Sequence, residues 1–170
     1  MKNRKPSRSS CMAGMFWTLL LLAADQITKA LACMYLKNTS GISLISGVFE
    51  LYYVENRGAA FGMLTNRQLL FVVIAVIMIA LSAFVYSRLP MEKHYDLLRA
   101  ACVLIAAGAG GNLIDRLARG YVVDFLYFSL IDFPVFNIAD CCVCIGAALA
   151  VILLFTVYKT EEFAFLKLRR

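Results

Sequence analysis

Four apolar stretches, each about twenty residues long, constrain this chain more than any other feature, because each is long enough to cross a hydrocarbon core. They lie near residues 13–33, 68–87, 97–117 and 139–158. Of the 170 residues, 62% are hydrophobic and 16% are charged, whereas ordinary soluble domains are about half apolar and a quarter charged. We therefore expect an all-α membrane protein whose four transmembrane helices form one integral membrane domain over residues 1–170.

The first stretch could also be a cleavable signal peptide. It is longer than the apolar region of such a peptide, however, and it contains the charged residues Asp25 and Lys29. Three more spans follow it. We interpret it as a retained helix.

Basic residues predict how the spans are oriented. They gather in three places, before the first span, beside the short loop between the second and third spans, and after the last span: Lys2, Arg4, Lys5, Arg8; Arg88, Lys93, Arg99; and Lys167, Arg169, Arg170. Short cytoplasmic loops carry such an excess of lysine and arginine. We expect both termini on the cytoplasmic side and the connections near 37–66 and 118–137 on the extracytoplasmic side. The net charge of +6 thus reflects topology, and we expect a phospholipid bilayer, not nucleic acid, as the partner.

The two outer connections differ in composition. Residues 47–54 are rich in β-branched and aromatic side chains, and glycines at 41 and 47 punctuate this connection, which predicts a short pair of strands. Residues 121–136 are rich in phenylalanine and tyrosine, which favour the membrane interface.

The residue types available limit the chemistry. His94 is the single histidine and lies in a polar loop, so histidine-based metal cages and nucleophile–histidine pairs are excluded. Cys141, Cys142 and Cys144 have no histidine companion and are interpreted as small apolar side chains. We expect no metal and no cofactor, which leaves carboxylates for any hydrolytic reaction.

Several polar residues lie within or beside the apolar stretches and need an explanation. Asp25 and Lys29 are four residues apart and form either a structural ion pair or a contact to substrate. Asn112, Asp115 and Arg116 share one helix face. Among the small residues nearby, Gly108 and Gly110 are interpreted as sites of tight helix packing. Asn56 and Gly58 form a polar turn before the second span, which could be an ordinary loop or a close approach to a ligand.

Two aspartates beside apolar runs are the strongest candidates for function. Asp124 lies in Val122-Val123-Asp124-Phe125, a setting that favours a protonated carboxyl group. Asp140 follows Asn137 where the fourth span starts; asparagine is a favoured N-cap, and the positive end of a helix favours an ionised acid. Capping alone would explain Asn137 and Asp140. Paired with Asp124, however, Asp140 would divide acid and base roles as catalytic aspartates do.

These residues resemble the bacterial lipoprotein signal peptidase (signal peptidase II) family over nearly the whole chain. The matching blocks come in the family's order: Asp25-Gln26-x-x-Lys29, Asn56-x-Gly58-Ala59-Ala60-Phe61, Gly111-Asn112-Leu113-Ile114-Asp115-Arg116, Val122-Val123-Asp124-Phe125 and Phe136-Asn137-x-Ala139-Asp140. Five short blocks in this order, between four matching spans, are highly specific.

The resemblance implies an aspartic endopeptidase that removes the signal peptide from diacylglyceryl-modified prolipoproteins in the bacterial inner membrane. It implies a small extracytoplasmic β-cradle and an interfacial helical segment over the site, in a chain that we expect to be a monomer. By resemblance Asp124 and Asp140 are the catalytic pair. The supporting or substrate-binding positions are Asp25, Lys29, Asn56, Gly58, Asn112, Asp115, Arg116 and Asn137.

The chain departs from the family pattern at a few positions. Ala107 and Gly110 stand within a run that usually reads Gly-Gly-Ala-bulky-Gly-Asn, and Cys141 replaces a common serine or threonine. Other classes also compete, namely a small transporter with a charged pathway and a scaffold without catalysis. The absence of a sequence repeat argues against the transporter.

Overall fold

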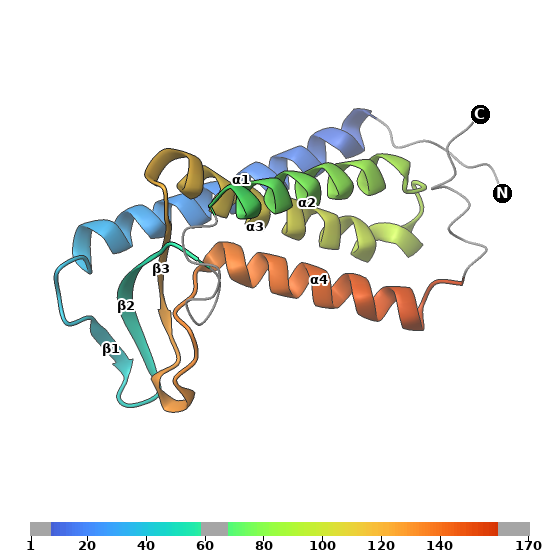
Figure 1. Ribbon diagram of the computed structural model, residues 1–170. Coiled ribbons are helices and arrows are strands. Elements are labelled where there is room, and N and C mark those ends of the chain that lie inside the picture. Colours follow the sequence, from blue (N-terminus) through green and yellow to red (C-terminus); the bar gives the residue numbers. More distant parts are fainter. Residues whose placement is uncertain (1–7, 59–67, 160–170) are drawn as a thin grey trace.

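Four long helices form most of the protein. The computed structural model describes residues 8–58 and 68–159 (Figure 1). The helices are α1 (Arg8–Tyr35), α2 (Gln68–Arg88), α3 (Asp96–Arg119) and α4 (Ile138–Thr156). Each is long and apolar enough to cross a membrane. The prediction of four transmembrane helices is confirmed, although α1 extends beyond the predicted span at both ends.

The helix α3 lies at the centre of the bundle. Each of the other three helices packs against it, whereas α1 and α2 scarcely touch each other. The contact with α4 is close because Gly108 has no side chain: a Cβ there would lie 2.9 Å from the amide nitrogen of Val143. The expected packing role of Gly108 is thereby confirmed.

A small antiparallel sheet lies at one end of the bundle (Figure 1). Its strands, in the order β1-β2-β3, are β1 (Ile42–Ile45), β2 (Phe49–Asn56) and β3 (Val122–Tyr127). The pair β1–β2 is the predicted strand pair. The strand β3 was not predicted, because its first four residues are all buried and show no alternation of apolar and polar side chains.

At the same end of the bundle, the described residues contain one short helical element where an interfacial helical segment was expected. After β3, the described residues form a single 3₁₀ turn, Ser129–Ile131. Residues 59–67 of the first connection, including Ala59, Ala60 and Phe61, lie outside the described ranges.

The opposite end of the bundle holds the short connection between α2 and α3. There Leu89, Tyr95 and Leu98 form a buried cluster with Leu153 and Tyr158. The rings of Tyr95 and Tyr158 stack at 5.4 Å between centroids. This cluster attaches the end of α4 to the start of α3. Because it is apolar and aromatic, this end of the bundle differs in chemistry from the sheet end.

Candidate active site

Asp124 is a buried carboxyl group on the strand β3. Its side chain is 1% exposed, and it accepts hydrogen bonds from two asparagine side chains. Asn56 Nδ2 donates to Oδ2 over 2.8 Å, and Asn137 Nδ2 donates to Oδ1 over 2.6 Å. Burial raises the pKa of Asp124 to about 7, and the negative charge of nearby Asp140 acts in the same direction. Asp124 can therefore hold a proton near neutral pH, as the apolar sequence around it predicted.

Asp140 lies in the first turn of α4. Asn112 Nδ2 donates to its Oδ1 over 2.7 Å. Its Oδ2 accepts the backbone N–H of Asn137 over 3.1 Å, while the Asn137 side chain accepts the backbone N–H of Asp140. The two residues thus form a reciprocal capping box, and the predicted N-cap at Asn137 is confirmed.

Asn137 connects the two aspartates. Its side-chain amide reaches Asp124, and its backbone amide reaches Asp140. The chain reaches this position because Phe136 pairs with Leu126 of β3 in an antiparallel bridge, immediately before α4 begins. Sheet pairing and helix capping therefore meet at one residue and place both carboxyl groups in one hydrogen-bond network.

A buried cation organises the other side of this network. Lys29 Nζ lies 2.9 Å from Asp25 Oδ2 and 3.1 Å from Asp115 Oδ2, and it donates to Asn112 Oδ1 over 2.9 Å. None of the three charged residues is more than 1% exposed. The structural ion pair foreseen for Asp25 and Lys29 is present. Because it is enclosed, it does not line an open charged pathway of the kind a transporter would use.

The two carboxylates around Lys29 also hold backbone in place. Asp25 Oδ1 accepts the N–H of Ala139 in the first turn of α4 over 2.9 Å. Asp115 Oδ2 accepts the N–H of Val123 in β3 over 3.2 Å. Each carboxylate therefore fixes the element that carries one of the candidate catalytic aspartates.

Arg116 and Gly58 complete the predicted set. The Arg116 guanidinium lies 4.8 Å from the ring centroid of Phe71 in α2, and its Nε has no hydrogen-bond partner among the described residues. Gly58 N–H donates to Asn56 Oδ1 over 2.9 Å, which turns the Asn56 amide nitrogen toward Asp124. All ten predicted site residues thus lie at the sheet end of the bundle, in or beside one network.

Two further residues belong to this region but were not among the predicted site residues. Gln26 Nε2 donates to the carbonyl oxygen of Gly111 and to Asp25, and its place beside Asp25 in the first matching block was the available signal. Phe71 supports Arg116, yet an aromatic residue in an apolar span carries no distinguishing signal.

Comparisons with known proteins show which family the chain belongs to. A family model described as signal peptidase (SPase) II matches residues 17–156. Among curated relatives, the lipoprotein signal peptidase of Symbiobacterium thermophilum is 44% identical over 140 residues, covering 81% of this chain and 91% of the relative. That of Pseudoalteromonas translucida is 38% identical over 165 residues, covering 92% and 96%.

A solved structure shares the whole fold. It is a bacterial membrane enzyme determined by the in meso method at 2.3 Å, with a TM-score of 0.76 and 26% identity, covering 100% of this chain and 99% of the other. The family match covers α2, α3, α4, the sheet and most of α1. The chain therefore belongs to the signal peptidase II family, the lipoprotein signal peptidases.

Proposed function

We propose that this protein is a membrane-embedded aspartic endopeptidase that removes the signal peptide from diacylglyceryl-modified prolipoproteins, with Asp124 and Asp140 as its catalytic pair. One observation carries the residue assignment: Asn137 donates to both carboxylates, from its side chain and from its backbone. Two acids in one network, of which Asp124 is fully buried and Asp140 half-buried, can share a proton, which is the arrangement that activates water in aspartic proteases.

The proposed reaction is general acid–base hydrolysis. Asp140, which lies at the positive end of α4, takes a proton from water, and the resulting hydroxide attacks the scissile carbonyl carbon. Asp124 gives its proton to the carbonyl oxygen. As the tetrahedral intermediate collapses, the C–N bond breaks and the amine leaves with a proton from the pair. The signal peptide keeps the new carboxylate, the lipidated cysteine keeps the amine, and no covalent enzyme intermediate forms.

The supporting residues divide by what they touch. Asn56, Asn112 and Asn137 donate to the catalytic carboxylates and orient them. Asp25, Lys29 and Asp115 fix the elements beneath, and Gly58 orients Asn56. The Nε of Arg116 has no partner among the residues that the structure describes, so we assign Arg116 to the peptide backbone of the substrate.

Physical considerations also suggest the cellular arrangement. The N-terminal end of α1, the C-terminal end of α4 and the α2–α3 connection lie opposite the sheet (Figure 1). Since these ends carry the basic residues, we infer that both termini are cytoplasmic and that the site faces the outer side of the bacterial inner membrane. Large apolar side chains exposed near the sheet, such as Leu130 and Ile131, which are 68% and 69% exposed, fit the outer lipid interface. A site assembled from one chain suits a monomer.

Topology can be tested with reporter fusions at residues 92 and 128. We expect the two reporters to lie on opposite sides of the membrane, with residue 92 in the cytoplasm. Reporters on the same side would contradict the four-span arrangement.

The catalytic assignment is tested by removing each acid separately. Asp124→Asn and Asp140→Asn should each abolish cleavage of a purified diacylglyceryl-modified precursor while the protein still inserts in the membrane. The matched control is Asp132→Asn, the same change at an acid after the 3₁₀ turn that accepts only the Tyr127 hydroxyl among the contacts described. Near-normal cleavage by either of the first two variants would contradict the assignment.

A further inference from the structure

The helix α2 contacts the candidate active site through the ring of Phe71. Of the described α2 residues, none has a hydrogen bond with any of the ten predicted site residues, and the helix packs against α3. The Phe71 ring centroid, however, lies 4.8 Å from the guanidinium carbon of Arg116 in α3. Both side chains are half-buried. This contact therefore links α2 to the groups around the two aspartates.

Few other contacts hold the Arg116 side chain. Its Nη1 donates to the carbonyl oxygen of Asn112 in the same helix over 3.4 Å, which is a long bond. Among the described residues Arg116 has no ion pair, and its Nε has no hydrogen-bond partner, although the charges of Asp140 and Asp124 act on it. Because an arginine side chain has many rotamers, the Phe71 ring does most to fix the position of this guanidinium.

An aromatic partner leaves a guanidinium able to bind a ligand. A carboxylate would take up two of its N–H groups in a bidentate pair and offset its charge. The face of a phenyl ring attracts the cation through the ring quadrupole when the centroid is within about 6 Å, yet the ring is only a weak hydrogen-bond acceptor. Arg116 therefore keeps both its charge and its donors beside the two acids.

The start of α2 is tied to the sheet close to the site. Gln68 lies three residues before Phe71 and donates from its Nε2 to the carbonyl oxygen of Arg57 over 3.0 Å. Arg57 directly follows Asn56, whose side chain donates to Asp124. Residues three apart lie on the same side of a helix. The bond from Gln68 therefore helps to fix the Phe71 ring relative to the catalytic carboxyl groups.

We propose that Phe71 is a positioning residue for the hydrolytic reaction: its ring holds the Arg116 guanidinium by a cation–π contact, so that the N–H groups of Arg116 meet the peptide backbone of the substrate. This inference rests on the proposed function, in which Arg116 binds that backbone. Weakening the ring contact should weaken substrate binding and leave the chemistry on Asp124 and Asp140 nearly unchanged. In kinetic terms, KM rises while kcat stays close to its wild-type value.

Fluorine substitution tests the contact without changing the shape of the ring. Phe71 is replaced with phenylalanines that carry one, two or three ring fluorine atoms, which withdraw electron density from the ring face at almost constant size. KM for the purified lipidated precursor should rise with each added fluorine, by about threefold to tenfold for three of them, while the melting temperature in detergent stays near that of the wild type. A KM that does not depend on the number of fluorine atoms would overturn the proposal, because packing alone does not respond to the ring quadrupole.

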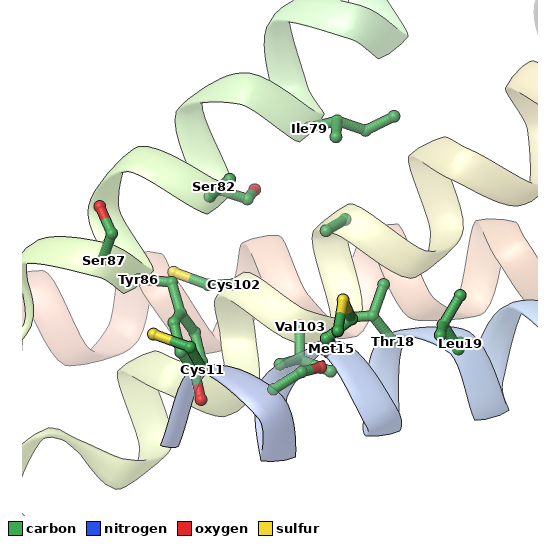
Figure 2. A pocket seen from close by; sticks show the side chains of 13 residues that line it. Cys11, Met15, Thr18, Leu19, Ile79, Ser82, Tyr86, Ser87, Cys102 and Val103 are labelled. Carbon is green, nitrogen blue, oxygen red and sulfur yellow. Dashed lines mark hydrogen bonds between the residues drawn. The ribbon is translucent and has the colours of Figure 1, made fainter. Parts of the chain in front are cut away.

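Phe84 provides a matched control on the same helix. The Arg88 guanidinium carbon lies 5.1 Å from its ring centroid, so the same kind of pair occurs roughly 20 Å farther along α2. The α2 residues Ser82 and Tyr86 in that stretch line an apolar cavity at the end of the bundle away from the aspartates (Figure 2). The same fluorine series at Phe84 should leave KM unchanged. A rise equal to that at Phe71 would overturn the proposal.

Two ordinary substitutions give an independent measurement. Phe71→Tyr keeps an aromatic face and should hold KM within about twofold of the wild type, whereas Phe71→Leu should raise KM about as far as three fluorine atoms do. Equal KM values for the two variants would overturn the proposal, and the fluorine series decides the matter if Phe71→Leu does not fold. A wild-type protein that leaves the precursor intact would overturn the proposed function, and the role of Phe71 with it. Cleavage by the wild type together with a fluorine series that has no effect would overturn the role of Phe71 alone.

Discussion

Lys29 donates a hydrogen bond to the side-chain oxygen of Asn112 over 2.9 Å. A lysine ammonium can only donate, so the Asn112 oxygen must face Lys29 and its amide nitrogen must face Asp140. Asn112 Nδ2 indeed lies 2.7 Å from Asp140 Oδ1. A buried cation thus determines which way a neutral amide presents itself to a candidate catalytic acid.

Replacing Lys29 should therefore damage both folding and catalysis. Lys29→Met leaves Asp25 and Asp115 buried without their shared cation, and breaking such a buried ion pair costs about 3–5 kcal/mol of unfolding free energy. We expect a large loss of thermal stability in detergent and little cleavage of the lipidated precursor.

The matched control for this change is Lys37→Met. Lys37 pairs with Glu55 on the surface at 3.0 Å, with 45% of its side chain exposed, so solvent screens the pair. The control should melt and cleave as the wild type does. If both lysine variants behaved alike, the organising role of Lys29 would be incorrect.

Asn137 has two functions that substitutions can separate. Asn137→Ser keeps an N-cap for α4 but is too short to reach Asp124, whereas Asn137→Ala loses the cap as well, at about 1 kcal/mol. We expect cleavage to fall at least about tenfold in both variants, with thermal stability lower in the alanine variant. Full activity in Asn137→Ser would show that the contact with Asp124 is dispensable.

Much of this architecture could be predicted from the sequence, because lipid imposes simple rules. Apolar length predicted the helices, and the N-cap preference of asparagine predicted the start of α4 at Asn137. These features depend on residues close together in the chain.

Other features could not be predicted, because they depend on contacts between distant residues. The strand β3 shows no alternation, since its first four residues, which belong to both faces, are all buried. On one face, Val123 and Phe125 pack in a cluster with Ala32 of α1 and with Leu36, the residue that follows α1. The bonds from Asp25 to Ala139 and from Asp115 to Val123 likewise join segments that only the fold brings together. The grouping of the predicted site residues came from the family resemblance.

Tight packing between α3 and α4 makes a prediction about the glycines of α3. A Cβ at Gly108 would meet backbone atoms of α4, whereas a Cβ at Gly110 would meet only the end of the Leu22 side chain, at 3.1 Å. Gly108→Ala should push the helices apart, shift Asn112 from Asp140, and lower both thermal stability and cleavage.

Gly110→Ala is the matched control. The flexible Leu22 can yield, and alanine favours the helix over glycine by about 1 kcal/mol, so this variant should be as stable as the wild type or slightly more so. Melting in detergent and the cleavage assay measure both variants. A Gly108→Ala protein as stable and active as Gly110→Ala would contradict the close contact.

The pKa of Asp124 predicts how stability depends on pH. Burial raises this pKa to about 7, whereas an aspartate in an unfolded chain titrates near about 3.9. Between these two values the folded protein holds a proton on Asp124 that the unfolded chain releases. The contribution of this group to stability is therefore greatest below about pH 4, and it declines as the pH rises through about 7. Asp124→Asn removes the titrating group. Its melting temperature should therefore exceed that of the wild type at pH 8 and match it more closely at pH 5, whereas Asp132→Asn should follow the wild type at both.

The same proton sets the pH range of catalysis. If Asp124 must be protonated while Asp140 is ionised, cleavage by the wild type should fall as the pH rises above about 7, because the pair then loses its shared proton. The measurement is kcat/KM for a lipidated precursor between pH 5 and pH 9, with melting curves at each pH to separate unfolding from loss of the catalytic form. A rate that kept rising to pH 9 in folded protein would mean that the proton on Asp124 is not required, and the acid role would have to pass to another group.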